Sequence, residues 1–362
     1  MAIMCGIGTV CIGDACLADG ENSALRSYQQ SQRHMGTEAR ITFYAPDDAV
    51  ANAAIQQAFA RIAELDACLS DYDAKSELVG VSRHFARLRA LADSGPDELS
   101  PDESHPARPL QLSEELWTVL AASQRISHMS HGAFDITIGP FSQLWRGALK
   151  SGKLPTEERL AQAREAVGWE KISLDATRRT VVWMHPGVRL DAGGIAKGFA
   201  ADEAMSVLAK FGLTRAMINF GGDLAIGNPP PGRAGWLIKL APSGELDDPT
   251  PPLRLANCGV ATSGDAWQFV EIGGRRYSHI LDPITGLGLT VRRGVSIVAP
   301  TAMQADALAS AVCVMGPTTG LQMVQALSDV ECIVVEKTRG ENRRFRTPGL
   351  ERRQAHDEPP AR

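Results

Sequence analysis

The chain has 362 residues and a mass of 38.8 kDa, enough for one large domain or two moderate ones. Hydrophobic residues make up 44% and charged residues 22%, which is typical of a soluble globular protein, and no stretch approaches the roughly 20 apolar residues of a membrane span. The formal net charge of −5 argues against a nucleic-acid-binding protein, and the seven cysteines include no C-x-x-C pair that would indicate a zinc site.

The predicted elements of the first half begin with a strand and a helix. After a polar lead, HMGTEARITFYAPD alternates in hydrophobicity as a strand does, and residues 48–70 follow with apolar positions at helical spacing. A second helix is expected from its N-cap Ser113 to Gly132. The remaining expectations are a loop and short helix over 69–83, an acidic, proline-rich surface loop without fixed structure over 93–109, a helix over 156–167, and strands over 171–184 and 188–193.

The second half is richer in strands. Strands are expected at 216–227, 236–241, 259–264, 275–282 and 294–300, with helices at 201–211, 302–315 and 319–327. Because the strands meander instead of alternating strictly with helices, the pattern favours an α+β fold over a doubly wound one. We expect one domain over 34–350, preceded by a poorly ordered N-terminal lead (1–33) and followed by a disordered tail (351–362).

A glycine-rich motif, RLDAGGIAKGFAADEA at residues 189–204, opens the helix expected near its end. Glycines between a strand and a helix let backbone N–H groups approach a phosphate, and Lys197 adds a positive charge near the helix N-terminus. The spacing fits neither G-x-G-x-x-G nor G-x-x-x-x-G-K-[ST]. On this motif alone, a tight turn with a solvated lysine is the favoured interpretation.

Two polar residues occur in apolar segments. Asp135 lies in GAFDITIGPFSQLW, where an acid must be paired, hydrogen-bonded or functional; a helix-capping role is the alternative. His279 lies in YSHILDPITG at a strand end, where catalytic groups tend to be placed, although a histidine on an apolar strand is more often a core residue.

The helix expected over 302–315 carries Asp306 and Ser310, which are four residues apart and therefore share a face. A carboxylate and a hydroxyl suit a hard, oxygen-liking cation such as magnesium. The alternative is an aspartate hydrogen-bonded near the helix start.

The order of the motifs resembles the FAD:protein FMN transferase family, the ApbE-like proteins. The resemblance runs from His34 to Gly316, and the TPGL at residues 347–350 is similar to the end of that family. The segments that carry it are HMGTEARI, LSDYDAKSEL, GAFDITIGP, RLDAGGIAKGFAADEA, NFGGDLAIG, ATSGDAWQFVEIGGRRYSHILDPITG and ADALASAVCVMG. The resemblance implies a T-fold-like ApbE-type architecture of antiparallel sheets with packed helices.

The function implied by the resemblance is magnesium-dependent protein flavinylation. Such an enzyme binds FAD as substrate and transfers FMN to a threonine hydroxyl of an acceptor flavoprotein, such as a subunit of a redox complex. A phosphoester forms and AMP is released. This chemistry needs a neutralised diphosphate and an aligned nucleophile more than covalent catalysis by the protein.

The resemblance also implies the roles of individual residues. Magnesium would be held by Asp306, by the side chain of Ser310 and by the backbone carbonyl of Gly194. His279 is the candidate to help deprotonate the threonine, with Asp282 as a candidate partner. Contacts to the flavin nucleotide would come from Met35, Tyr72, Ala133, Phe134, Asp135, Asp191, Lys197, Ile280 and Ala309.

Two alternatives to the transferase remain at this point. One is a magnesium-dependent FAD pyrophosphatase, in which water replaces the threonine. The other is a non-catalytic flavin-binding protein, against which the joint presence of Asp306, Ser310 and His279 argues. Serine stands at position 310 where the family usually has threonine, which keeps the hydroxyl.

The sequence allows two cellular locations, the periplasm and the cytoplasm. The resemblance suggests the periplasmic side of the inner membrane, whereas MAIMCGIGTVCIGDACLADG lacks the charged region of a secretory signal and a convincing lipoprotein cleavage site, so a cytoplasmic location is the alternative.

Overall fold

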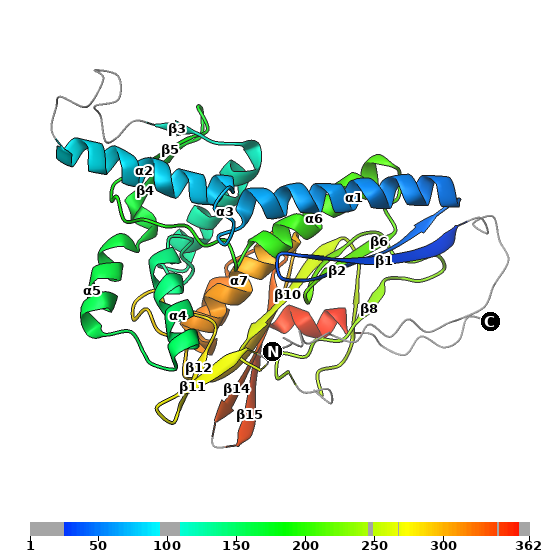
Figure 1. Cartoon of the computed structure of the whole chain (residues 1–362). Helices are drawn as coiled ribbons and strands as arrows, with labels where there is room; N and C mark the ends of the chain where they lie inside the picture. The colour runs from blue at the N-terminus through cyan, green and yellow to red at the C-terminus, as the bar shows by residue number, and fades with distance from the viewer. Residues whose placement is uncertain (1–24, 95–108, 245–248, 267, 339, 355–362) are drawn as a thin grey trace. The chain divides into compact units, whose positions relative to one another are not determined.

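The computed structural model describes residues 25–94, 109–244, 249–266, 268–338 and 340–354, which divide into two compact units (Figure 1). We call them the sheet unit and the helical unit. The sheet unit comprises the described parts of 1–63, 197–267 and 291–362, and the helical unit those of 64–196 and 268–290. Each unit is therefore assembled from segments that lie far apart in the sequence.

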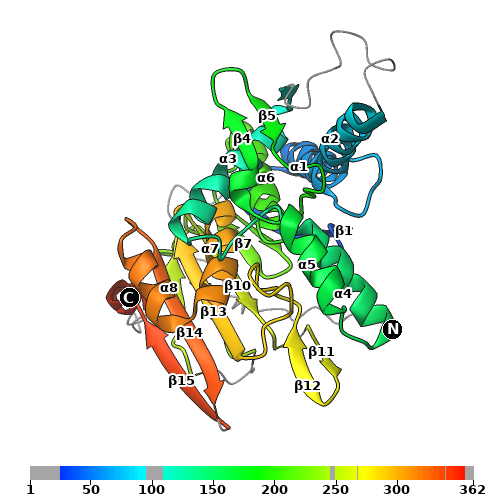
Figure 2. The ribbon, with the colours of Figure 1, turned by 90° about the vertical axis from the view of Figure 1, so that its left-hand side faces the viewer.

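The sheet unit is built on one open antiparallel sheet with β1 and β15 at its edges (Figures 1 and 2). In sheet order the strands are β1 (Arg26–His34), β2 (Thr37–Ala45), β6 (Ala216–Phe220), β7 (Asp223–Ile226), β10 (Cys258–Gly264), β13 (Arg292–Ala299), β14 (Glu331–Thr338) and β15 (Glu341–Arg346). The register places Ile41 opposite Ile218 and Ile297 opposite Cys332. Apolar residues thus face each other across neighbouring strands, which stabilises the pairing.

Both faces of the central strands are covered. Helix α7 (Ala302–Met315) packs against β7, β10 and β13, while Val298 and Ile333 belong to a core cluster that includes Trp236 of β8 (Trp236–Ile238). Strands buried on both faces explain the nearly unbroken apolar runs of β13 and β14. The other elements that lie wholly or mostly in this unit are α1 (Asp48–Leu69), α6 (Ala196–Lys210), β8 (Trp236–Ile238), β9 (Leu253–Leu255), α7 (Ala302–Met315), α8 (Pro317–Gln325) and the 3₁₀ helix η3 (Pro348–Arg353).

The helical unit has a core around Phe141, Trp145, Leu160 and Tyr277. Helix α3 (Glu114–Met129) begins at the N-cap that the sequence suggests, since Ser113 accepts a hydrogen bond from the Leu116 N–H. Its elements are α2 (Glu77–Ser94), β3 (Leu110–Gln111), α3 (Glu114–Met129), α4 (Gly139–Ser151), α5 (Glu157–Ala166), the 3₁₀ helix η2 (Trp169–Lys171), β4 (Ile172–Asp175), β5 (Thr180–Trp183), β11 (Phe269–Ile272) and β12 (Arg275–Ser278).

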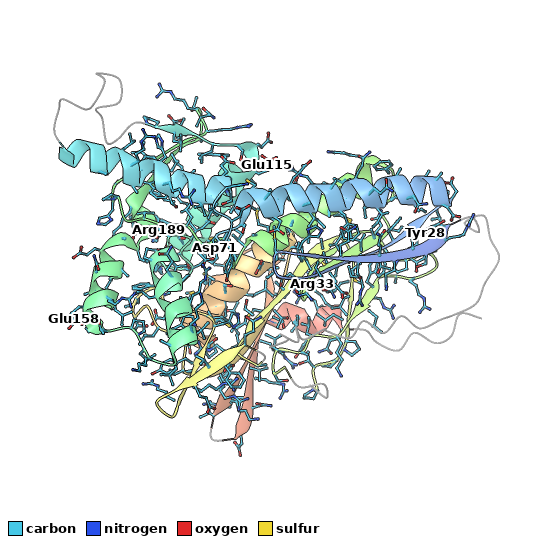
Figure 3. All side chains as sticks on the ribbon, in the orientation of Figure 1. Tyr28, Arg33, Asp71, Glu115, Glu158 and Arg189 are labelled. Carbon is cyan, nitrogen blue, oxygen red and sulfur yellow. The ribbon has the colours of Figure 1, made fainter. Side chains whose placement is uncertain are left out.

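The predicted α+β class with antiparallel sheets and packed helices is confirmed, and several local expectations are wrong. Part of the expected lead (1–33) forms β1, where the Tyr28 ring (Figure 3) stacks on Phe43 at 5.5 Å and its hydroxyl donates to Asp48 at 2.7 Å. The expected short helix is α2, which has 18 residues. Residues 171–184 fold as the β4–β5 hairpin, because the D-A-T-R-R segment supplies a turn.

Three further differences concern the ends of elements. Residues 188–193 form no strand; Arg189 makes only an isolated bridge with Ile138. Helix α3 ends at Met129, ahead of Gly132, whose N–H donates to the Ser127 carbonyl at 2.8 Å. The first residues of the expected tail (351–362) complete η3, whereas 355–362 and most of the acidic loop 93–109 lie outside the described residues. Across the described ranges, no helix combines the length and the hydropathy of a bilayer span.

Candidate active site

A buried charge cluster joins three elements of the sheet unit. Lys197, in the first turn of α6, donates from Nζ to Asp223 at the start of β7 and to Asp306 of α7, the latter at 3.4 Å. The backbone N–H of Gly198 also donates to Asp306 Oδ2 at 3.2 Å. The helix start thus contributes both a charged side chain and a backbone donor, rather than a solvated lysine.

The cluster sets one ammonium between two almost inaccessible carboxylates. The side chains of Asp223 and Asp306 are 4% and 3% exposed, and that of Lys197 is 28% exposed. Burial raises the pKa of Asp223 to about 7, together with the charge of Asp306 and against the opposing effect of Lys197. Burial alone would lower the pKa of Lys197, but the two aspartates raise it above its ordinary value. When both carboxyls are ionised, the cluster therefore carries two negative charges against the single positive charge of Lys197.

Asp223 is a residue that the sequence analysis missed. It stands in the quoted segment NFGGDLAIG and begins a strand whose four residues are all buried. An acid at the start of an otherwise apolar strand is the signal that could have found it, since a buried carboxylate needs a partner.

Helix α7 also carries the other two residues predicted for this region. Ser310 lies one turn after Asp306, and its Oγ is 3.4 Å from Ser263 Oγ of β10, while Ala309 is fully buried. The described residues contain no group of three or more His, Cys, Asp or Glu side chains that could hold a metal ion. A cation at Asp306 would therefore need hydroxyl, carbonyl, water or substrate oxygens as its other ligands, which is the usual arrangement for magnesium.

Met35 lies at the turn between β1 and β2 and has a positive φ of 46°, followed by Gly36 at 76°. The turn is thus held in a left-handed conformation that only a few residue types adopt without strain.

A second charge cluster lies in the helical unit and includes Asp71 (labelled in Figure 3). Arg146 of α4 donates to Asp71, lies 3.8 Å from Asp191, and places its guanidinium 4.0 Å from the ring centroid of Tyr72. Tyr72 is 78% exposed, so the arginine holds an aromatic ring at the surface of this unit. Burial raises the pKa of Asp71, as does the charge of Asp191, against the hydrogen bond from Arg146. Neither Asp71 nor Arg146 was predicted as a site residue.

The glycine-rich motif forms a turn that leads into α6. Asp191 Oδ1 accepts the Gly193 N–H at 2.9 Å, and a Cβ on Gly193 would lie 3.0 Å from that oxygen. The Ala192 carbonyl then accepts the N–H groups of Ile195 and Ala196, which starts the helical spiral. Gly194 lies between these bonds, at the centre of the turn.

Asp135 is buried, as its apolar setting suggested. Its Oδ1 accepts the backbone N–H of Thr137 at 2.8 Å and the hydroxyl of Thr137 at 2.6 Å. Burial raises its pKa to about 6 despite these hydrogen bonds. Phe134 is buried and Ala133 is half-buried beside it, so this segment is packed into the helical unit.

His279 directly follows β12 and is exposed, with its Nδ1 3.1 Å from the Gln268 carbonyl oxygen. It is not the core histidine that was the alternative. Asp282, the candidate partner, instead accepts the Ile284 N–H at 2.9 Å and the Thr285 hydroxyl at 3.2 Å within its own turn. Ile280 is half-buried, and its N–H donates to Ser278 Oγ.

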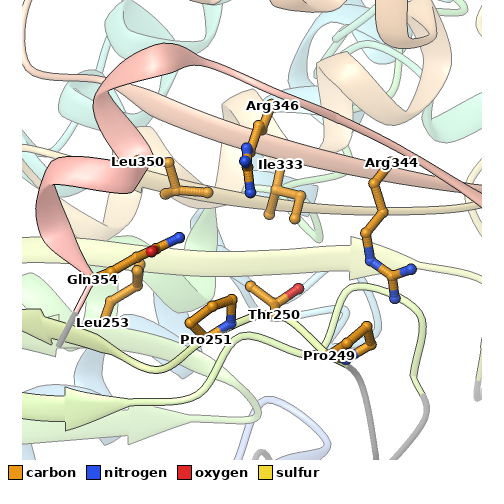
Figure 4. Close-up of a pocket in the computed structure, with 9 residues that line it drawn as sticks. All are labelled: Pro249, Thr250, Pro251, Leu253, Ile333, Arg344, Arg346, Leu350 and Gln354. Atoms are coloured by element: carbon orange, nitrogen blue, oxygen red, sulfur yellow. The ribbon is translucent and has the colours of Figure 1, made fainter. Parts of the chain in front are cut away.

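A pocket of about 350 Å³ in the sheet unit is separate from these clusters (Figure 4). Most of its lining side chains are apolar and two are arginines, and none of the residues predicted to bind FAD or magnesium lines it. The lining residues are Pro249, Thr250, Pro251, Leu253, Ile333, Arg344, Arg346, Leu350 and Gln354.

Comparison with known proteins decides the family. The family model described as the ApbE family matches residues 35–334, most of the chain. The chain belongs to the ApbE family. Among the ApbE relatives, the FAD:protein FMN transferase of Chlamydia muridarum is 33% identical over 215 residues, 58% of this chain and 66% of that protein. The FAD:protein FMN transferase of Treponema pallidum is 27% identical over 351 residues, 92% of this chain and 89% of that protein.

A solved structure confirms the ApbE-type fold. The flavin transferase ApbE from Vibrio cholerae superposes with a TM-score of 0.76 at 24% identity, covering 91% of this chain and 99% of that one. The family resemblance deduced from the motifs is therefore correct, and this ApbE protein is an enzyme of the transferase class.

Proposed function

We propose that this ApbE-family chain is a magnesium-dependent FAD:protein FMN transferase that moves FMN from FAD to a threonine hydroxyl of an acceptor flavoprotein. The names of its relatives support the flavin transfer itself. The observation that carries the metal-dependent chemistry is the Lys197–Asp223–Asp306 cluster, with the Ser310 hydroxyl one turn away on α7.

The donors present fit a magnesium ion. Asp306 and Ser310 offer oxygen ligands on one helix face, and the Gly194 carbonyl is the proposed backbone ligand. Two buried carboxylates against one ammonium leave the cluster with a deficit of positive charge, which a divalent cation would remove. When bound, magnesium would neutralise diphosphate oxygens and polarise the phosphorus that is attacked.

The chain's own residues would bind and orient the substrate. Lys197, at the N-terminal turn of α6, supplies positive charge for a phosphate while its bonds to Asp223 and Asp306 hold it in place. Asp191 offers a carboxylate for ribose hydroxyls, and its own turn fixes it through the Gly193 N–H. Tyr72 offers an exposed ring face to a planar part of the nucleotide.

His279 is the proposed acceptor of the threonine proton. With its Nδ1–H donated to the Gln268 carbonyl, the neutral ring has its lone pair on Nε2, which can take the proton. The threonine oxygen then forms a bond to the FMN phosphorus as the bond from that phosphorus to the AMP oxygen breaks. The proton is passed on to solvent or to AMP.

The test is to incubate the purified full chain with FAD and Mg²⁺, with an acceptor flavoprotein domain or its Thr→Ala variant, and to weigh all products by mass spectrometry. An acceptor heavier by one FMN, only with Mg²⁺ and only with its threonine, is the expected result. Free FMN and AMP without acceptor modification would identify a pyrophosphatase instead. Intact FAD would overturn the proposal.

Asp306→Ala is expected to abolish transfer, because it removes the carboxylate proposed to hold the metal. Asp329→Asn is the matched control, since Asp329 is an exposed acid on the same unit and asparagine tolerates its positive φ of 60°. Normal transfer by a folded Asp306→Ala protein would contradict the metal assignment.

A further inference from the structure

The first turn of α7 is held by a carboxylate from another helix. Asp202 of α6 accepts the N–H of Ala302 at Oδ1 and the N–H of Met303 at Oδ2, each at 2.9 Å. Thr301, the N-cap of α7, accepts the Gln304 N–H at 3.2 Å. Three of the four N–H groups that a helix start leaves without intrahelical partners are thus satisfied, two of them by Asp202.

The same turn is confined sterically. A Cβ on Gly198 would lie 2.3 Å from the Ala302 carbonyl oxygen, and a Cβ on Gly259 of β10 would lie 2.2 Å from the Ala302 nitrogen. Helix α7 therefore begins between two glycines whose missing side chains allow backbones to approach closely. A shift of α7 along or around its axis would break both carboxylate bonds and cause a clash.

One turn further along α7 stands Asp306, which α6 also holds. Gly198 donates its N–H and Lys197 its ammonium to Asp306 Oδ2, at 3.2 and 3.4 Å. Helix α6 thus forms hydrogen bonds with α7 at two positions. Asp202 binds the start of α7, and residues 197 and 198 bind the candidate metal ligand Asp306. The proposed mechanism gives Asp202 no role of its own.

We propose that Asp202 is a positioning residue: it fixes the register of α7 on α6, so that the Asp306 carboxylate and the Ser310 hydroxyl are preorganised for the cation. This inference rests on the proposed function for the identity of the metal ligands. Burial raises the pKa of Asp202 to about 6, so the carboxyl is ionised at neutral pH and favourably placed at a helix N-terminus.

The neighbouring residue provides a matched control. Glu203 is also an acid on α6 in an ion pair, but its carboxylate pairs with Arg61 of α1 at 2.7 Å. Glu203→Gln therefore weakens the attachment of α6 without touching the start of α7. Asp202→Asn keeps the side-chain shape and one acceptor oxygen, and it turns an amide NH₂ toward a backbone N–H.

The experiment measures binding of Mn²⁺, as a paramagnetic substitute for Mg²⁺, to the full chain with FAD by electron paramagnetic resonance. Asp202→Asn is expected to weaken Mn²⁺ binding about tenfold, as loss of a group that orients metal ligands does. The Mg²⁺ concentration for half-maximal transfer should rise in parallel, while the KM for FAD stays within about twofold. Glu203→Gln should leave Mn²⁺ affinity unchanged, whatever its melting temperature.

A second variant perturbs the same contact without removing a charge. Gly198→Ala places a methyl group against the Ala302 carbonyl and should weaken Mn²⁺ binding in the same direction. If Asp202→Asn and Glu203→Gln lower the melting temperature alike and bind Mn²⁺ like the wild type, Asp202 is only structural and the inference is overturned. A wild-type chain that binds no Mn²⁺ would overturn the metal site as well. Mn²⁺ binding that depends on Asp202 without any FMN transfer would support the inference and overturn the proposed function.

Discussion

The two charge clusters of this protein have the same composition, one basic residue between two aspartates, but differ in how deeply these residues are buried. In the sheet unit the base is Lys197 and the acids are 3–4% exposed; in the helical unit the base is Arg146 and both acids, Asp71 and Asp191, are 17% exposed. In the lysine cluster the Gly198 N–H also donates to Asp306, whereas in the arginine cluster the guanidinium lies over the exposed Tyr72 ring.

The comparison shows that the same charged groups have different properties when they are buried to different extents. Deep burial makes ionisation of the lysine cluster's carboxyls costly, and the pKa of Asp223 is raised for that reason. The arginine cluster keeps its charge close to solvent, and the planar guanidinium can pair with carboxylates and stack on Tyr72 at once. In the proposed function it would orient uncharged parts of the nucleotide.

Removing the base should affect the lysine cluster most. Lys197→Met would leave two buried carboxylates facing each other without the ammonium between them, and we expect a loss of about 3 kcal/mol in the free energy of unfolding. Urea denaturation at pH 8 measures it. If Lys197→Met loses less free energy of unfolding than Arg146→Met, the buried carboxylates do not depend on the Lys197 charge as described above.

Asp135 sharpens the comparison, because it is buried and Thr137 donates two hydrogen bonds to it, whereas no ion pair to it is found within the part of the chain that the structure describes. Its folded pKa of about 6 lies above the ordinary value of 3.8, so its stabilising contribution is full below about pH 4 and is lost as the pH rises through 6. Asp135→Asn should therefore be more stable than the wild type by up to about 2 kcal/mol at pH 8, with the gain disappearing at pH 4.

Urea denaturation of both proteins across this pH range measures the difference. The control is Asp175→Asn, an acid with a 43% exposed side chain that also accepts backbone N–H groups in its turn. Equal pH profiles for wild type and Asp135→Asn would contradict the assigned cause.

The smallest effect is expected for the arginine cluster. Arg146→Met should cost about 1 kcal/mol of unfolding free energy, because the remaining aspartates can be hydrated. Its larger consequence should be weaker FAD binding through the loss of support for Tyr72, measured by the quenching of FAD fluorescence. Arg146→Lys keeps the charge but not the planar stacking group, so it should restore stability more than FAD affinity.

Much of the fold could be predicted from local patterns. The helix over 302–315 and the cap at Ser113 follow from apolar periodicity and from side chains that satisfy helix-start N–H groups. Strand β1 could not be predicted in this way, because RSYQQSQRH is polar and exposed along nearly its whole length. Its order comes from pairing with β2 and from contacts such as Tyr28 with Phe43, which are invisible to periodicity.

The same limit applies to the site. Asp306 and Ser310 were predicted because their spacing on one helix is local. Asp223 and Asp202 were missed because the hydrogen bond that makes each of them informative comes from a residue distant in the sequence. The donor is Lys197 for Asp223 and Ala302 for Asp202. Tertiary hydrogen bonds of this kind leave no local pattern beyond the improbability of an acid in an apolar segment.

The order of strands in the sheet also has a consequence for synthesis of the chain. Strand β2 pairs with β1 on one side and with β6 on the other, and Phe43 stands opposite Ala216, roughly 170 residues later. At the usual speed of translation, the N-terminal hairpin leaves the ribosome on the order of 10 s before the strand that covers its open edge. The exposed polar side chains of β1 disfavour aggregation only at the edge of the hairpin that β1 forms. The other edge, formed by the apolar strand β2, has unpaired backbone groups that must be kept from pairing with other chains until β6 is made.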